Sequence, residues 1–164
     1  ELATRRLIDD GCSRILCLRS NSRMRMPANK RTDAYLDVVE QAGLPALVRE
    51  VEFVKSDDEK SAVVAKILDE NPDIDGIFAG DDTMAAICLN VMKRRGLSAP
   101  DDIKVVGADG ARRTMTFMPD LTTVRQDIDR IGELAAQSII ALVNGEKPES
   151  NIKLPVELIE GKTA

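Results

Sequence analysis

Apolar and polar positions follow two different rhythms along the 164 residues of the chain. Short apolar runs, typical of strands buried in a parallel sheet, are separated by longer segments. In those segments apolar residues recur every three or four positions, as they do in amphipathic helices. Such a regular alternation is the signature of βα units. The pattern therefore predicts an α/β fold built around a parallel sheet.

The expected elements follow from where each rhythm starts and stops. Glycine, proline and capping residues mark the ends of the helices. Strands are expected at residues 14–19, 48–53, 75–80, 103–109 and 153–160, with a shorter β-prone stretch at 121–124. Helices are expected at residues 1–10, 30–42, from a cap at Asp57 or Asp58 to just before Pro72, at 82–95 and at 127–144.

Carboxylates stand where two of these strands end. Asp81 and Asp82 follow the third expected strand, and Asp109 closes the fourth. Because ligands of open parallel sheets bind at the carboxyl ends of the strands, these side chains are expected to lie near one another. An aspartate at a helix start usually caps the helix, so Asp82 is interpreted as the helix cap. Asp81 precedes it, which leaves its side chain free to project into a cleft.

The amino-acid composition limits the kinds of reaction or binding in which these carboxylates could take part. The chain has no histidine, which excludes Ser-His-Asp and Cys-His catalysis. Asp81, Asp82 and Asp109 could hold Mg²⁺, but the lysine that a phosphate-accepting receiver site needs after the next strand is absent. Paired carboxylates could also hydrolyse a glycoside. With arginine and glutamine nearby, the set suits hydrogen bonding to hydroxyl groups better, so we predict no catalysis, metal or cofactor.

The charge balance argues against DNA binding by these residues alone. Lys and Arg number 23 against 28 Asp and Glu, a formal charge of −5, which provides no global basic field to hold nucleic acid. One locally basic run lacks aromatic stacking residues nearby and is interpreted as a solvated loop, with a polyanion site as the alternative. It contains Arg19, Arg23, Arg25, Lys30 and Arg31.

Cysteine usage and hydropathy bear on the compartment. Cys12, Cys17 and Cys88 are odd in number, and their spacing fits neither a zinc site nor a disulfide framework. Their apolar surroundings predict buried free thiols in a reducing cytosol. No apolar run reaches the roughly 18 to 20 residues that a membrane helix needs. We therefore expect a cytoplasmic location and no membrane partner.

Several stretches resemble the effector-binding core of LacI-type bacterial transcriptional repressors. The resemblance covers essentially the whole chain and is most specific between Pro100 and Gln126. It is carried by "ATRRLIDDGCSRILCL", "KRTDAYLDVVEQAGL", "IFAGDDTMAAICLNVMKRRGLSAPDDIKVVGADGA", "PDLTTVRQDIDRIGELAAQSIIALVNGE" and "LPVELIEGKTA", in that order.

The resemblance implies a two-lobed core like that of the periplasmic sugar-binding proteins, preceded by a helix-turn-helix and a hinge helix. It implies a three-layer parallel-sheet lobe of the periplasmic-binding-protein-like type I fold. Residues 1–126 would form the C-terminal lobe, 127–150 a crossover helix of the N-terminal lobe, and 151–164 a strand returning to the C-terminal lobe. The DNA-binding headpiece and most of the N-terminal lobe would then lie outside this sequence.

In that family the cleft between the lobes holds a small effector, usually a sugar, a sugar derivative or a purine. The residues matching the family's effector contacts are Arg31, Asp81, Asp109 and Gln126. Carboxylates and a guanidinium suit a hydroxyl-rich ligand. Where many members have a stacking aromatic after the second strand, this chain has Lys55 or Ser56. If Lys55 enters the cleft, a phosphorylated or acidic sugar becomes more plausible.

The resemblance also implies partners. It implies a homodimer, for which Ala86, Asn90 and Phe117 are candidate contacts, with core packing as the alternative for Phe117. Operator DNA would be bound only through the headpiece. A sugar-binding protein of a transport system, which shares the fold, is the alternative function. Without the N-terminal lobe, the apolar helix 127–144 is expected to fold back on this lobe, pair with a second copy or become disordered.

Overall fold

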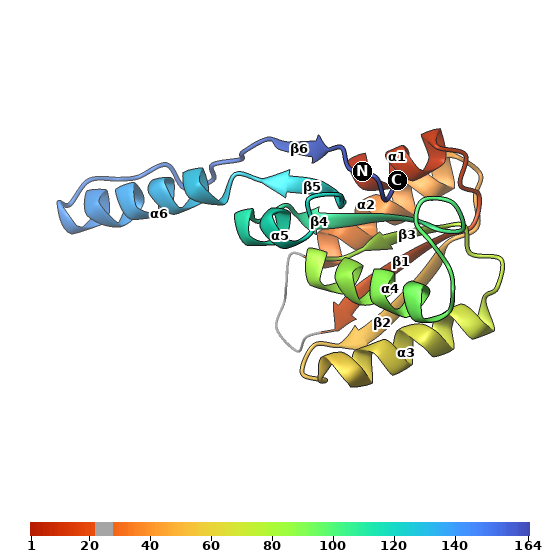
Figure 1. Cartoon of the computed structure of the whole chain (residues 1–164). Coiled ribbons are helices and arrows are strands. Elements are labelled where there is room, and N and C mark those ends of the chain that lie inside the picture. The colour runs from red at the N-terminus through yellow and green to blue at the C-terminus, as the bar shows by residue number, and fades with distance from the viewer. Residues whose placement is uncertain (22–27) are drawn as a thin grey trace.

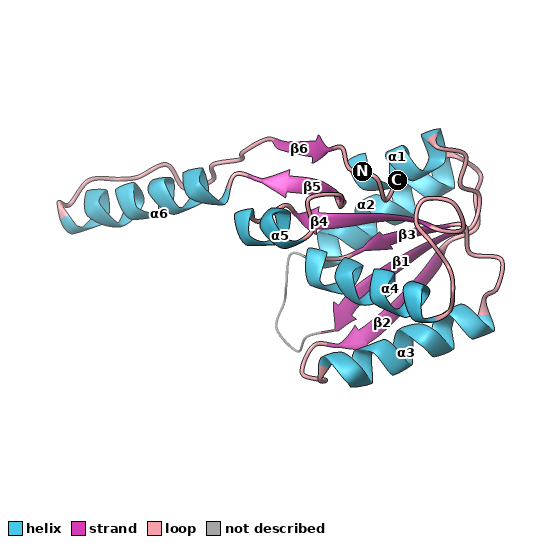
Figure 2. Ribbon diagram, viewed as in Figure 1, coloured by secondary structure: helices cyan, strands magenta, loops and turns pink. Residues whose placement is uncertain are grey.

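The computed structural model of the chain describes residues 1–21 and 28–164, with side chains given from residue 30 onward after that gap. It is a six-stranded sheet with helices on both faces (Figure 1, Figure 2). The predicted α/β fold is therefore confirmed. Arg23 and Arg25 of the predicted basic loop lie outside the described residues.

All strands except one run in the same direction. They are β1 (Ile15–Asn21), β2 (Leu47–Glu52), β3 (Gly76–Ala79), β4 (Lys104–Asp109), β5 (Thr122–Gln126) and β6 (Val156–Ile159). Their order is β2-β1-β3-β4-β5-β6, and every neighbouring pair is parallel except β5 and β6, which are antiparallel. The carboxyl ends of β1 to β5 therefore meet at one edge. β6 differs because the chain leaves this edge after β5 and returns to it.

Helices enclose the sheet in two layers. Helices α1 (Leu2–Asp9) and α2 (Ala28–Gln41) cover one face, and α3 (Asp57–Glu70) and α4 (Asp82–Arg94) cover the other. Because successive residues of a strand point to opposite faces, β1 serves both layers. Leu16 and Leu18 pack on the α3 and α4 side, whereas Ile15 and Cys17 pack on the α1 and α2 side.

Tyr35 fixes α2 against the sheet. Its side chain is fully buried, and its hydroxyl donates to the carbonyl of Ile15 at 2.7 Å and accepts from the amide of Leu47 at 2.9 Å. A buried hydroxyl with both partners satisfied is a specific anchor. Because α2 begins where β1 ends, Arg31, one turn before Tyr35, is held at the carboxyl edge of the sheet.

Two helix predictions need correction. The cap of α3 is Ser56, and neither Asp57 nor Asp58 caps this helix. The Ser56 hydroxyl accepts from the amide of Glu59 while the Glu59 carboxylate accepts from the amide of Ser56, which is a capping box. The short helix α5 (Arg112–Phe117) was not predicted, because its 6 residues are too few to show a helical period.

Helix α6 (Ile128–Val143) projects away from the body (Figure 1). None of its residues is buried, and Ile139 is 62% exposed. The expectations that it would fold back on this lobe or become disordered are therefore wrong, because it is a regular helix that stands apart. Helices α1 to α4 already cover the two faces of the sheet. Its pairing with a second copy stays a prediction.

Within residues 1–21 and 28–164, no helix is both long enough and apolar enough to cross a bilayer.

Candidate functional site

Polar side chains gather where the parallel strands end. Arg31 reaches this edge from α2, Asp81 follows β3, Asp109 closes β4 and Gln126 closes β5. We call Arg31, Asp81, Asp109 and Gln126 the strand-tip cluster. The carboxyl edge of a parallel α/β sheet is where such folds bind ligands.

Asp109 lies at the centre of the strand-tip cluster. Its Oδ1 accepts from Arg31 Nη2 at 2.6 Å and from Gln126 Nε2 at 2.8 Å. Within the described residues no hydrogen bond reaches its Oδ2, and the side chain is 34% exposed. Asp109 is thus oriented by its neighbours and still presents a free acceptor oxygen.

Arg31 joins the ends of two strands that are neighbours in the sheet. One guanidinium nitrogen forms the ion pair with Asp109 after β4, and the other donates to the carbonyl of Gly80 directly after β3. A guanidinium can donate in several directions from one plane, so these bonds do not use all its N–H groups. Arg31 therefore bonds to Asp109 and to Gly80, the residue directly before Asp81.

The structure corrects the predicted helix cap at the start of α4, and the role of Asp81 as an effector contact stays a prediction. Asp81 is the helix cap, because its extended backbone (φ −153°, ψ 166°) lets Oδ1 accept from the amide of Met84 at 2.8 Å. The interpretation of Asp82 as the cap is therefore wrong. The second oxygen of Asp81 lies 3.4 Å from the Ser20 hydroxyl at the end of β1. One face of Asp81 is thus occupied by capping, and only Oδ2 is directed toward the strand ends.

Asp82 is the first residue of α4 and lies inside the molecule. It is 3% exposed, with Oδ1 accepting from the Thr123 hydroxyl at 2.6 Å and Oδ2 from the amide of Gly110 at 2.8 Å. Burial raises the pKa of this carboxyl, and the nearby charges of Asp109 and Asp81 add to the effect. The hydrogen bonds from Thr123 and Gly110 act in the opposite direction. The three aspartates are thus close enough to interact, as predicted.

Lys55 lies apart from this group. It follows β2, which is separated from β4 by β1 and β3, a span of roughly 14 Å at about 4.8 Å for each strand spacing. Its Nζ is 3.9 Å from Glu59 in the first turn of α3. Among the described contacts none joins Lys55 to Arg31 or Asp109, so its place in the cleft stays a prediction.

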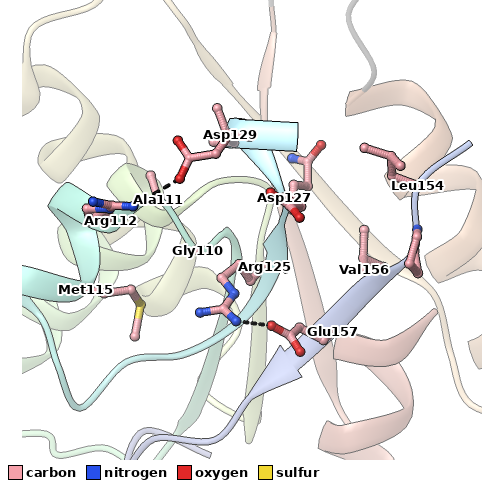
Figure 3. A pocket seen from close by; sticks show the side chains of 13 residues that line it. Gly110, Ala111, Arg112, Met115, Arg125, Asp127, Asp129, Leu154, Val156 and Glu157 are labelled. Atoms are coloured by element: carbon pink, nitrogen blue, oxygen red, sulfur yellow. Dashed lines mark hydrogen bonds and ion pairs between the residues drawn. The ribbon is translucent and has the colours of Figure 1, made fainter. Parts of the chain in front are cut away.

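Two of the cavities that adjoin the strand-tip cluster differ in their lining. One of about 410 Å³ is bordered by Arg31 and Gln126 together with apolar side chains of the strands, Phe78, Ala108 and Val124. The other, about 710 Å³, lies between α5, the end of β5 and the segment before β6 and is shown in Figure 3. Ion pairs flank it, one between Arg112 and Asp129 at 3.0 Å and one between Arg125 and Glu157. Gln126 borders both spaces.

Arg112 and Arg125 are not among the site residues predicted from the sequence. Arg112 follows the expected strand 103–109, and Arg125 directly follows the β-prone stretch 121–124, so periodicity gives no direction for either side chain. The pairing of Arg125 with Glu157 depends on the antiparallel register of β5 and β6. No signal in the sequence fixes that register.

The predicted dimer contacts lie on the surface to different degrees. Asn90 is exposed, Ala86 is half-buried, and Phe117 is 74% exposed. Core packing as the explanation for Phe117 is therefore wrong. Exposure permits an intermolecular contact, and the dimer itself stays a prediction.

The thiols are placed as predicted. Cys12, Cys17 and Cys88 are buried and free. Burial raises the pKa of the Cys12 thiol to about 11 and those of Cys17 and Cys88 to about 12. Thiols with such pKa values are almost wholly protonated at neutral pH and are poor nucleophiles and poor metal ligands. Residues 1–21 and 28–164 contain no grouping of three acidic, cysteine or histidine side chains arranged for a metal ion.

Comparison with known sequences extends this picture. The model of the periplasmic binding protein-like domain matches residues 4–164. The ribose operon repressor of Halalkalibacterium halodurans is 32% identical over 164 residues, which cover 99% of this chain and 48% of that protein. The chain spans about half the length of the curated relatives that it matches.

Solved structures agree with the sequence relatives. A LacI-family transcriptional regulatory protein from Corynebacterium glutamicum superposes with a TM-score of 0.86 at 26% identity, over 98% of this chain and 61% of that one. A LacI family transcriptional regulator from Arthrobacter sp. FB24, in complex with lactose, superposes with a TM-score of 0.84 at 25% identity. That match covers 99% of this chain and 60% of the regulator.

Proposed function

Because the chain belongs to the family of periplasmic binding protein-like domains, and resembles the LacI-type effector-binding core along its length, we propose that it senses a sugar effector for a transcriptional regulator. The observation that carries this proposal is the convergence of Arg31 and Gln126 on one oxygen of Asp109. A sugar hydroxyl that donates to the free Oδ2 of Asp109 and accepts from Arg31 would find both partners oriented in advance.

The ligand is held and left unchanged. The described donors and acceptors, a guanidinium, an amide and half-exposed carboxylates, are suited to hydroxyl groups, and the relatives matched are repressors. Their names also favour a regulator over the sugar-binding protein of a transport system. Operator DNA would be bound by a headpiece outside these residues, in the cytoplasm, by a homodimer to which Ala86, Asn90 and Phe117 contribute.

Coupling to DNA would follow from differential binding. A ligand that contacts this edge and an opposing lobe favours the closed arrangement of the two lobes, because it gains contacts there that the open arrangement lacks. The distance between paired headpieces would then depend on ligand. Such a coupling acts on operator affinity and needs no chemical step.

Calorimetric titration of the full-length protein tests the effector site. The panel is D-ribose, sucrose, lactose and cellobiose, together with ribose 5-phosphate and glucose 6-phosphate. We expect Asp109→Ala and Arg31→Ala each to weaken sugar binding by about 1.5–3 kcal/mol, the usual contribution of a hydrogen bond to a charged group. That loss corresponds to about a tenfold to hundredfold change in Kd.

Arg14→Ala is the matched control. Arg14 has a side-chain exposure of 28%, close to the 27% of Arg31, and it also pairs with an aspartate, Asp73, but at the opposite end of the sheet. It should leave Kd unchanged. Unaltered affinity in both Asp109→Ala and Arg31→Ala would refute the site. Lys55→Ala should weaken only phosphorylated ligands if Lys55 enters the cleft.

A further inference from the structure

We infer that Asp82, which is buried beneath the strand-tip cluster, is the positioning residue that orients the effector contact Asp109. This inference rests on the proposed function, since it takes Asp109 as an effector contact. Asp82 acts on the turn that follows β4 and does not itself touch the ligand.

Asp82 joins the segments that carry the strand-tip cluster. Its backbone belongs to the first turn of α4, directly after Asp81. Its Oδ2 accepts from the amide of Gly110 after β4, and its Oδ1 accepts from the hydroxyl of Thr123 in β5. A buried carboxylate needs such partners, because an unsatisfied one would carry a large desolvation penalty. The same bonds therefore hold α4, the end of β4 and β5 in register.

In the turn after β4, Asp109 has a backbone conformation that is unfavourable for residues other than glycine. Asp109 has φ 114° and Gly110 has φ 58°. Asp109 is the only residue other than glycine with positive φ among the described residues. Such a conformation persists in a non-glycine residue only when the surroundings fix it. The bond from the Gly110 amide to Asp82 is the contact that fixes it, and this conformation aims Asp109 at Arg31 and Gln126.

Two nearby glycines leave space that this arrangement needs. A Cβ on Gly107 would lie 2.5 Å from Asp82 Oδ1, so only glycine leaves room for the carboxylate beneath β4. A Cβ on Gly110 would lie 2.6 Å from the Cβ of Arg125. The carboxylate and the turn above it therefore fit as one unit. Thr123, which bonds to Asp82 from β5, lies three residues before Gln126, whose side-chain amide donates to Asp109.

The test measures the Kd of D-ribose and of lactose for the full-length protein by calorimetry. Asp82→Ala and Thr123→Val should each weaken binding by on the order of tenfold, the lower end of what hydrogen-bonded supports of binding residues contribute in metal sites. Thr123→Ser keeps the hydroxyl and should restore the wild-type Kd. Thr122→Val is the matched control, because Thr122 is equally buried but bonds to the C-terminal carbonyl of Ala164. It should leave Kd unchanged.

A double-mutant cycle separates positioning from general destabilisation. If Asp82 acts through Asp109, Asp82→Ala should cause no further loss in an Asp109→Asn background. Wild-type affinity in folded Asp82→Ala, or the same tenfold loss with and without Asp109, overturns the inference. If Asp82→Ala fails to fold, Thr123→Val enters the same cycle and decides in the same way.

A crystal structure of the Thr123→Val protein gives a readout that needs no ligand. The inference expects the 2.6 Å contact between Arg31 and Asp109 to lengthen and the φ of Asp109 to change. Retention of both overturns it. If the wild-type protein binds neither sugar, the proposed function fails for these probes, and the geometry of the turn still decides whether Asp82 positions Asp109.

Discussion

Ile77 and Ile139 are both isoleucines in regular structure, yet their surroundings are opposite. Ile77 in β3 is fully buried between the helix layers, whereas Ile139 in α6 is 62% exposed. Helices of the same chain cover the central strands of the sheet, so Ile77 is buried within these residues. The apolar face of α6 has no such cover here. The contrast teaches that an amphipathic pattern shows where an apolar face lies, and says nothing about which segment covers it.

The largest expected effect is on the free energy of unfolding when Ile77, the buried residue of the pair, is replaced. Ile77→Ala should lower the free energy of unfolding by about 2–5 kcal/mol, because it removes buried methyl and methylene groups and leaves a cavity. Urea unfolding followed by circular dichroism measures the change. Ile77→Val, which removes a single methylene, should cost about 0.5–1.5 kcal/mol. A loss below 1 kcal/mol for Ile77→Ala would contradict a close-packed core around β3.

The body of the fold could be predicted because its constraints are local. Runs of apolar residues located all the strands within a few positions, and loops at the carboxyl edge brought Arg31, Asp109 and Gln126 together as expected. The approach of Asp81, Asp82 and Asp109 follows from parallel strands that end at one edge, whereas Arg31 and Gln126 were expected there from the resemblance to a known family. The resemblance to a known family added which of these polar groups to select.

Other features depend on distances that no sequence pattern encodes. Whether Asp81 or Asp82 caps α4 depends on which of them adopts the extended backbone, a shift of a single residue. The Asp82 partners, Gly110 and Thr123, are 28 and 41 positions away in sequence, so only the packed structure reveals them. The path of α6 depends on surfaces already covered by other helices. These are tertiary effects, which override local propensity.

A smaller effect is expected on the pH dependence of stability, and it arises from the buried carboxylate of Asp82. Burial chiefly raises the pKa of Asp82 above its ordinary value of 3.8. The folded state therefore binds this proton more tightly than the unfolded chain does. The stability that this proton contributes is fully present below pH 3.8 and is lost as pH rises through the raised value.

Asp82→Asn cannot titrate and provides the reference. The free energy of unfolding of the wild type minus that of Asp82→Asn should fall as pH rises from below 3.8 and level off once Asp82 is ionised. Urea unfolding at a series of pH values measures this difference. A difference that grows with pH would mean that hydrogen bonds from Thr123 and Gly110 outweigh burial.

The smallest expected effect is that of replacing Ile139, the exposed residue of the pair. In the 164-residue chain, Ile139→Ala should change the free energy of unfolding by about 0.5 kcal/mol or less, because Ile139 is 62% exposed and alanine favours helix. Gln137→Ala, also exposed in α6, is the matched control. In the full-length protein, a covering lobe should raise the cost of Ile139→Ala to about 1 kcal/mol or more while leaving Gln137→Ala unchanged. A large cost already in the 164-residue chain, growing with protein concentration, would instead mean that a second copy covers α6, because association links stability to concentration.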